Sequence, residues 1–246
     1  MPSVNMQDVH VVILAGGKGT RLRPYATAFP KPLMPVGDLP VLEIVLRQLH
    51  YFGFRKITLS VNHLAELIRA FCGDGAKWGL DLRYYVENEP LGTAGSIGLV
   101  EDLTDPFLVM NGDLLTTLDY AALVAAHVES GACATMGVFP REVRIDFGVV
   151  ALDERGHLAE YKEKPRLEYL VSMGVNAFSR AALDFIPKGQ YLDIPTLMMN
   201  LKNAGRTVAA FRSPCEWLDI GRPDDYERAT ECFEAARSRY LRATPP

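Results

Sequence analysis

The first half of the chain alternates two patterns of apolar residues, one typical of buried strands and one typical of amphipathic helices. Residues Val9 to Ala15 form a run that is apolar except for His10 and rich in β-branched side chains, which predicts a strand buried on both faces. After Pro40, apolar residues recur at the spacing of one helical face, which predicts a helix that ends near Gly53. The same alternation predicts further strands at 56–61, 82–86 and 107–110 and further helices at 64–71, 94–100 and 120–127. Strands that alternate with helices imply right-handed crossovers and an open, mostly parallel sheet.

The pattern changes after Gly131, where strand-like segments follow one another with few helical signals between them. Strands are expected at 133–139, 148–152, 157–161 and 172–178, which favours a mixed or antiparallel arrangement there. Pro223 then opens a final helix, expected over about 223–242. We therefore predict an α/β fold: a single Rossmann-like three-layer domain over residues 1–246, with a central, mostly parallel mixed sheet and a small antiparallel portion.

Composition narrows the classes of protein to consider. The formal net charge of −4 argues against a nucleic-acid partner, because phosphate contacts need a basic surface. The four cysteines show no C-x-x-C spacing, which indicates neither a zinc site nor a disulfide framework and favours a reducing, cytoplasmic location. No apolar stretch approaches the roughly 20 residues that a membrane-spanning helix needs, so no membrane association is expected.

The first predicted strand runs directly into a glycine-rich turn, and Leu14 to Pro24 reads LAGGKGTRLRP. Glycines at a strand end let backbone N–H groups approach a phosphate closely, and three basic side chains follow in the same segment. The turn is not a Walker A loop, since Lys18 precedes Gly19, and it is not a dinucleotide fingerprint, since Leu22 replaces the third glycine. Taken alone, a phosphate loop and an ordinary turn with solvated charges remain equally open.

Here the sequence resembles the sugar-1-phosphate nucleotidyltransferases, including the mannose- and heptose-1-phosphate guanylyltransferases. Those enzymes carry G-G-x-G-T-R-L-x-P after the first strand. Further blocks of the family occur in order: FPKPLMPV (29–36), ENEPLGTA (87–94), NGD (111–113), FGVV (147–150), EKP (163–165), GVNAF (174–178) and WLDIG (217–221). The resemblance implies a nucleotide-binding part over about 8–130, a sugar-binding part over about 131–222 and the C-terminal helix.

The reaction implied by the resemblance is attack of a sugar-1-phosphate oxygen on the α-phosphorus of a nucleoside triphosphate, with release of pyrophosphate. Arg21 and Lys31 are then expected to stabilise the triphosphate charge, and Asp113 to be catalytic as well. The family's metal site corresponds to Asp113 and Asp219, so Mg²⁺ is the expected cofactor. Without the resemblance, Asp113 is more often a turn residue, and the two cations are exposed charges.

The nucleotide site implied by the resemblance comprises Leu14, Ala15, Gly16, Gly17, Gly19, Thr20, Arg21, Glu87, Pro90, Gly92 and Thr93. A carboxylate at Glu87 can accept from both N1–H and N2–H₂ of guanine, whereas uracil has a single N–H donor there. We therefore expect GTP, with UTP, dTTP or another triphosphate left open.

The sugar-phosphate site implied by the resemblance comprises Gly148, Glu163, Lys164 and Asn176. Glu163 would hold sugar hydroxyls and Lys164 the sugar phosphate. Read from the residues alone, 161–165 is a charged strand end. Mannose- and heptose-type sugars are favoured.

Two other classes of protein stay open. A glycosyltransferase would hold its metal with a D-x-D pair, whereas residues 111–113 supply only one carboxylate. A silent subunit that binds nucleotide sugars for a partner enzyme would lack charged residues that this chain keeps, such as Lys31 and Asp219. The C-terminal helix could pack on its own core or on a second subunit, so homo-oligomers are an open expectation. His127, on an apolar helical face, is expected to be a packed histidine rather than a ligand.

Overall fold

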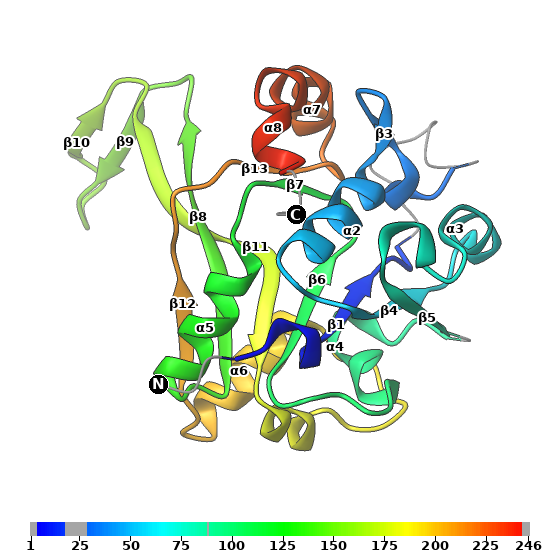
Figure 1. Ribbon diagram of the computed structural model, residues 1–246. Coiled ribbons are helices and arrows are strands. Elements are labelled where there is room, and N and C mark those ends of the chain that lie inside the picture. Colours follow the sequence, from blue (N-terminus) through cyan, green and yellow to red (C-terminus); the bar gives the residue numbers. More distant parts are fainter. Residues whose placement is uncertain (1–3, 18–28, 88, 243–246) are drawn as a thin grey trace.

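The structure is a computed structural model that describes residues 4–17, 29–87 and 89–242 (Figure 1). Its centre is a seven-stranded sheet in the order β12-β8-β11-β6-β1-β4-β5, in which only β11 runs opposite to the others. The strands are β1 (His10–Leu14), β4 (Lys56–Val61), β5 (Asp81–Val86), β6 (Phe107–Asn111), β8 (Ala134–Arg144), β11 (Arg166–Phe178) and β12 (Val208–Phe211). The predicted α/β class and the mixed, mostly parallel sheet are confirmed.

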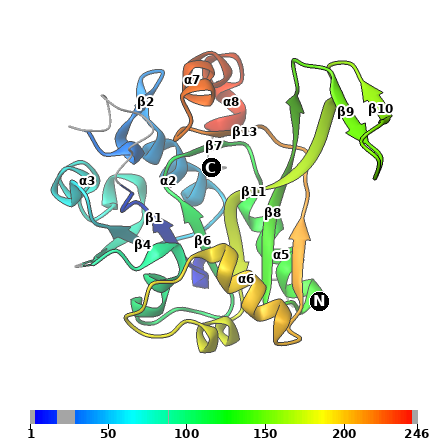
Figure 2. The ribbon, with the colours of Figure 1, turned by 180° about the vertical axis from the view of Figure 1, so that it is seen from behind.

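Helices cover both faces of this sheet. They are α2 (Val41–Tyr51), α3 (Ala65–Cys72), α4 (Gly92–Gly95), α5 (Tyr120–Ser130), α6 (Ile194–Asn203), α7 (Pro223–Ala235) and α8 (Arg237–Tyr240). Figure 1 shows α2 and α5 in front of the sheet, and Figure 2, seen from behind, shows α6 on the opposite face. Short 3-10 helices join the elements: η1 (Met6–Asp8), η3 (Lys31–Leu33), η4 (Ala76–Trp78), η5 (Ile97–Leu99) and η6 (Arg180–Phe185).

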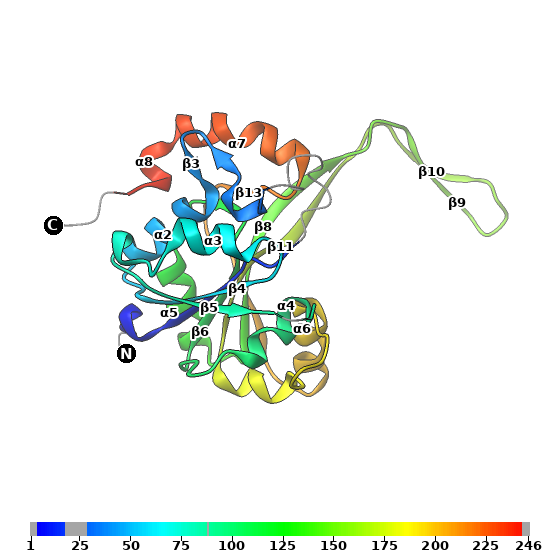
Figure 3. The same ribbon diagram turned by 90° about the vertical axis from the view of Figure 1, so that its right-hand side faces the viewer.

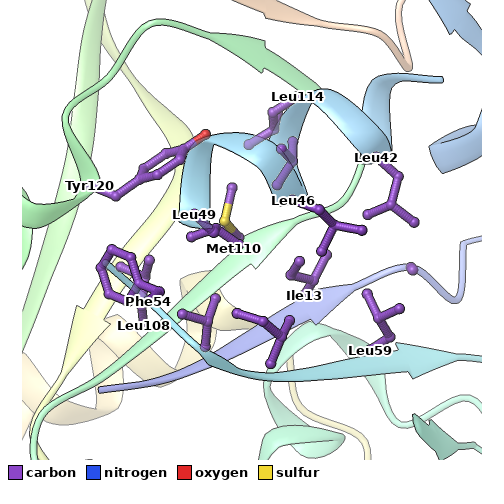
Figure 4. Packing of buried hydrophobic residues seen from close by; sticks show 14 of the residues in the cluster. Ile13, Leu42, Leu46, Leu49, Phe54, Leu59, Leu108, Met110, Leu114 and Tyr120 are labelled. Carbon is purple, nitrogen blue, oxygen red and sulfur yellow. The ribbon is translucent and has the colours of Figure 1, made fainter. Parts of the chain in front are cut away.

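The side chains of β1 show why two core layers form. Val11 and Ile13 point to one face and pack with α2, α3 and α5, whereas Val12 points to the other face and packs with α4 and α6. Figure 4 shows the first of these layers, where Ile13 and Met110 meet Leu46 of α2. Because successive residues of a strand face opposite sides, an unbroken apolar run fits a strand buried on both faces, as the sequence predicted.

A third apolar cluster joins the C-terminal helices to the outer side of α2. Phe233 and Tyr240 are fully buried in it, beside Ile44. Small antiparallel pairs complete this region: β2 (Pro35–Val36) with β3 (Leu39–Pro40), and β7 (Leu114–Thr116) with β13 (Trp217–Asp219). Of the two alternatives left open for the C-terminal helix, it takes the first and packs on the chain's own core.

Two sequence expectations differ in detail from the structure. The predicted helix at 94–100 is instead the four-residue α4 followed by η5, because Gly95 and Gly98 lie within it. The C-terminal helix is divided into α7 and α8 at Ala236. Across the described residues, no helix is long and apolar enough to cross a membrane.

Residues 139–171, which we call the arm, extend beyond the body of the molecule (Figure 3). β12 pairs with β8 only as far as Gly137, and β6 pairs with β11 only from Val175, so the arm is a two-stranded ribbon whose edges pair with no other strand in the described part of the chain. Its tip is the hairpin of β9 (Val149–Leu152) and β10 (Leu158–Lys162). Large apolar side chains of the arm are exposed: Val143, Phe147, Val149, Val150, Leu152, Leu158, Tyr161, Tyr169 and Leu170.

Candidate active site

A cavity of about 580 Å³ opens where β1, β4, β5 and β6 end. These four strands are parallel, so the segments that follow them meet at one edge of the sheet, where open α/β sheets bind ligands. The lining residues are Leu14, Ala15, Gly16, Gly17, Lys31, Pro32, Asn62, Glu87, Pro90, Gly92, Thr93, Ser96, Asn111, Asp113 and Tyr191. Thus the nucleotide-site residues named from the sequence lie together wherever the structure describes them.

Lys31 and Asp113, which line this cavity, form one cluster with the second predicted metal carboxylate, Asp219, which is not among the lining residues. Lys31 Nζ lies 2.7 Å from Asp113 Oδ2. Asp219 ends β13, whose antiparallel pairing with β7 puts it opposite Leu114, directly beside Asp113. The amide of Ile220 donates to the carbonyl of Asp113 at 3.1 Å. A side chain at Gly221 would collide with the Lys31 ammonium, so glycine leaves the room that Lys31 occupies.

The electrostatics of this cluster favour a cation. Burial and the neighbouring Asp113 carboxylate raise the pKa of Asp219, while the Gly221 amide and Lys31 oppose the rise. The Gly221 amide donates to Asp219 Oδ1 at 2.9 Å and fixes that oxygen. Among the described residues, no group of three or more His, Cys, Asp or Glu side chains could hold a metal. A divalent ion here would therefore rest on two carboxylates and take its other ligands from phosphate oxygens and water, which suits Mg²⁺.

Glu87, the predicted base reader, is held from two sides. The Ser60 hydroxyl donates to Glu87 Oε1 at 2.7 Å, and Asn62 Nδ2 donates to the Glu87 carbonyl at 3.1 Å. A Cβ built on Gly16 would lie 3.5 Å from Glu87 Oε1, so even a methyl side chain at this position would contact the carboxylate. Sequence reasoning missed Ser60, although a hydroxyl inside the apolar strand 56–61 was a signal of a polar neighbour.

Some residues that line the cavity were not identified as site residues from the sequence. Tyr191 lines it from the loop before α6, and Asn62, Ser96 and Asn111 line it elsewhere. Asp193 accepts from the Thr93 amide across about one hundred residues of sequence, and the Tyr191 hydroxyl donates to Asp193. No local motif could have indicated this pairing.

Of the other nucleotide-site predictions, Gly19, Thr20 and Arg21 lie outside the described residues.

The predicted sugar-phosphate residues do not line the cavity. Gly148, Glu163 and Lys164 lie on the arm, where the Tyr161 hydroxyl donates to Glu163 Oε2 at 2.9 Å and Lys164 Nζ lies 3.9 Å from Glu163 Oε1. The Tyr161 ring leaves no room for a side chain at Gly148. Asn176 is instead buried in β11, and its Oδ1 has no hydrogen-bond partner among the described residues.

His127 has the surroundings of a packed residue. It is 1% exposed, and its ring nitrogens lie 2.9 Å from Thr135 Oγ1 and 3.1 Å from Ser179 Oγ. Burial lowers its pKa, which favours the neutral ring. It lines none of the cavity, so its predicted role as a packed histidine is consistent with the structure.

Comparisons with known proteins agree on one family. The family model described as Nucleotidyl transferase matches residues 10–235. UTP–glucose-1-phosphate uridylyltransferase of Synechocystis sp. is 35% identical over 238 residues, covering 89% of this chain and 61% of the relative. Mannose-1-phosphate guanylyltransferase of Mycobacterium tuberculosis is 32% identical over 233 residues, covering 91% of this chain and 64% of the relative. The chain thus spans less than two thirds of either relative.

Solved structures with the same fold include HddC from Yersinia pseudotuberculosis, complexed with GMP-PN. It has 26% identity and a TM-score of 0.70, with 92% of this chain and 99% of that chain covered. A Bacillus anthracis protein in complex with a sucrose has a TM-score of 0.73 at 24% identity, with 91% and 94% covered. The latter likeness concerns the fold alone.

Proposed function

This chain belongs to the nucleotidyl transferase family, and from that premise we propose that it transfers a nucleoside monophosphate from a nucleoside triphosphate to a sugar 1-phosphate. A sugar-1-phosphate oxygen attacks the α-phosphorus in line, the bond from that phosphorus to the bridging oxygen breaks, and pyrophosphate leaves. The observation that carries the proposal is the cluster in which Lys31 and Asp113, which line the cavity at the carboxyl ends of parallel strands, lie beside Asp219.

The residues of this cluster meet the electrostatic needs of the reaction. Asp113 and Asp219 would hold a magnesium ion, which supplies neutralisation of phosphate charge when bound. Lys31 then offers its ammonium, now 2.7 Å from Asp113, to the oxygens of the triphosphate. The N–H groups that follow β1 at Gly16 and Gly17 are the proposed phosphate donors, with Arg21 as a further cation.

We favour GTP as the nucleotide. Glu87 faces the cavity, and the Ser60 bond at 2.7 Å leaves Oε2 and a lone pair of Oε1 to accept N1–H and N2–H₂ of guanine. The GMP-PN complex of HddC and the guanylyltransferase from Mycobacterium tuberculosis support this choice. The Synechocystis relative, a UTP-dependent enzyme by name, makes UTP with glucose 1-phosphate the second candidate.

The acceptor we propose is a mannose- or heptose-type sugar 1-phosphate. Asn176 is the proposed amide of the sugar pocket, and its Oδ1 has no partner among the described residues; because the side chain is buried in β11, a sugar hydroxyl would reach it only after the surrounding chain moved. Glu163 and Lys164 would bind the sugar and its phosphate from the arm, where both side chains are exposed.

The test is pyrophosphate release with Mg²⁺ across a grid of GTP, UTP, dTTP, CTP and ATP against glucose, mannose and heptose 1-phosphates. The fastest turnover is expected for GTP. Fastest turnover with UTP would support the proposed reaction but refute the proposed recognition of guanine by Glu87. Release of a nucleoside diphosphate in place of pyrophosphate would indicate a glycosyltransferase. Nucleotide-sugar binding without turnover would indicate a silent regulatory subunit.

A further inference from the structure

The loop that carries Gly92 and Thr93 is held by a distant segment rather than by its own helix. α4 has only four residues, so it provides little support of its own. Its amides at Ala94 and Gly95 donate to the carbonyl of Leu192 at 2.8 and 2.9 Å, and the Leu192 amide donates to Leu91 at 2.9 Å. The loop is therefore docked by its backbone on residues 190–194.

The side chain of Asp193 closes this contact. Its Oδ1 accepts from the Thr93 amide at 3.0 Å and from the Thr93 hydroxyl at 3.2 Å, and its Oδ2 accepts from the Tyr191 hydroxyl at 2.7 Å. The Thr93 oxygen in turn accepts from the Ile194 amide at 2.8 Å. Tyr191 and Thr93 both line the cavity, so a single carboxylate joins two parts of its wall.

The position of Asp193 makes this use of its carboxylate unexpected. Asp193 is the N-cap residue of α6, where an aspartate ordinarily accepts an amide of its own helix. Here the side chain makes no cap hydrogen bond and turns to Thr93 and Tyr191 instead. The hydrogen bonds from Tyr191 and from the Thr93 amide lower the pKa of the Asp193 carboxyl, so it stays ionised and keeps all its acceptors.

The glycines of the loop fit the same contact. Gly92 has a φ of +73°, and a Cβ there would lie 2.6 Å from the Leu192 carbonyl oxygen. A Cβ at Gly95 would lie 2.5 Å from the Gln190 carbonyl oxygen. The two segments thus touch through their backbones, and a shift of residues 190–194 would move the loop with them.

We propose that Asp193 is a positioning residue of the nucleotide site, which holds the Gly92–Thr93 backbone and the Tyr191 ring in the geometry that binds the triphosphate. The identity of the ligand, a nucleoside triphosphate, rests on the proposed function, whereas the hydrogen bonds of Asp193 exist in the free protein. The two can therefore be tested separately.

The first measurement is amide hydrogen exchange of the free protein. In Asp193→Ala, the peptide over 91–95 should exchange about tenfold faster or more, because the Thr93 amide loses a charged acceptor. The peptide over α5 should be unchanged. Asp184→Ala is the matched control, since Asp184 is exposed and its side chain makes no hydrogen bond or ion pair within the described ranges. Unchanged exchange at 91–95 in Asp193→Ala would overturn the proposal, whatever the enzyme's activity.

The second measurement connects the loop to the nucleotide. GTP turnover by Asp193→Ala should show a KM for GTP raised about tenfold or more, with the Mg²⁺ dependence unchanged. Tyr191→Phe, which removes one of the three donors, should show a smaller rise. Faster exchange with an unaltered KM would make Asp193 merely structural and would also overturn the proposal. If Asp193→Ala does not fold, Asp193→Ser, which keeps a residue favoured at a helix N-cap but removes the carboxylate, is measured in its place by the same criteria. If wild type turns over no triphosphate, the proposed function fails while the exchange experiment still decides the role of Asp193.

Discussion

The ion pair between Arg141 and Asp225 permits a quantitative prediction about stability. Arg141 lies in β8 at the root of the arm, and its guanidinium donates to both carboxylate oxygens of Asp225 at 3.1 and 3.0 Å. Asp225 lies in the first turn of α7 with its side chain 3% exposed, whereas that of Arg141 is 29% exposed. Asp225 Oδ2 also accepts from the amide of Asp219 at 3.3 Å, so the pair supports the backbone of a predicted metal ligand.

Removal of Arg141 and removal of Asp225 should lower the free energy of unfolding by different amounts. Within the described residues, Arg141→Ala leaves a buried carboxylate with the Asp219 amide as its one remaining donor, and the free energy of unfolding should fall by about 3 kcal/mol, the lower end for a broken buried pair. Asp225→Ala leaves a guanidinium that water can reach, so the loss should be about 1–2 kcal/mol. The double variant should be more stable than Arg141→Ala alone, because it contains no unpaired buried charge.

Equilibrium unfolding in urea measures all three variants, with shifts in the midpoint at constant m-value read as stability. An Arg141→Ala variant that loses no more than Asp225→Ala would refute the reasoning. So would a double variant whose loss equals the sum of the single losses.

Three further predictions concern catalysis, specificity and pH. Asp113→Asn should lower pyrophosphate release about 100-fold or more while the melting temperature stays near that of wild type; turnover like wild type would remove Asp113 from the metal site. Ser60→Ala should reduce the ratio of kcat/KM for GTP over UTP about tenfold, because Glu87 Oε1 loses the donor at 2.7 Å. An unchanged ratio would show that Ser60 does not contribute to the choice of base. Burial lowers the pKa of His10 and His127 below 6.5, so the unfolded chain binds protons that the folded chain does not. The stability present above pH 6.5 should therefore fall by up to ~1.4 kcal/mol per pH unit for each histidine as the pH drops below that value, and a His127→Gln variant in urea unfolding should show a shallower fall; equal slopes would contradict it.

Much of the fold was predictable because local patterns determine it. The strand predicted at 56–61 coincides with β4, and Asp119 accepts the Ala122 amide as the N-cap of α5. The short strands β7 and β13 were not foreseen, since three residues carry no periodicity and their pairing joins segments about one hundred residues apart. Of the strands of the arm, β9 and β10 were foreseen, but the predicted strands at 133–139 and 172–178 stop short of the parts of β8 and β11 that form its ribbon. That these strands leave the body was not foreseen either, because long-range packing decides where a hairpin lies.

The candidate site likewise contains residues that could be identified from the sequence and residues that could not. Lys31, Asp113 and Asp219 were named from ordered family motifs, and the structure brings them into one cluster. Ser60 and Asp193 have no motif of their own, and their roles become visible only through contacts with Glu87 and Thr93.

The most direct test of the central claim follows the phosphorus atoms. With Mg²⁺, GTP and mannose 1-phosphate or a heptose 1-phosphate, label at the α-phosphate of GTP should appear in a nucleotide sugar, and label at the γ-phosphate should appear in pyrophosphate. Asp113→Asn should slow both transfers equally. Appearance of the γ-label as free phosphate, with the α-label in GDP and no nucleotide sugar formed, would contradict the proposed reaction.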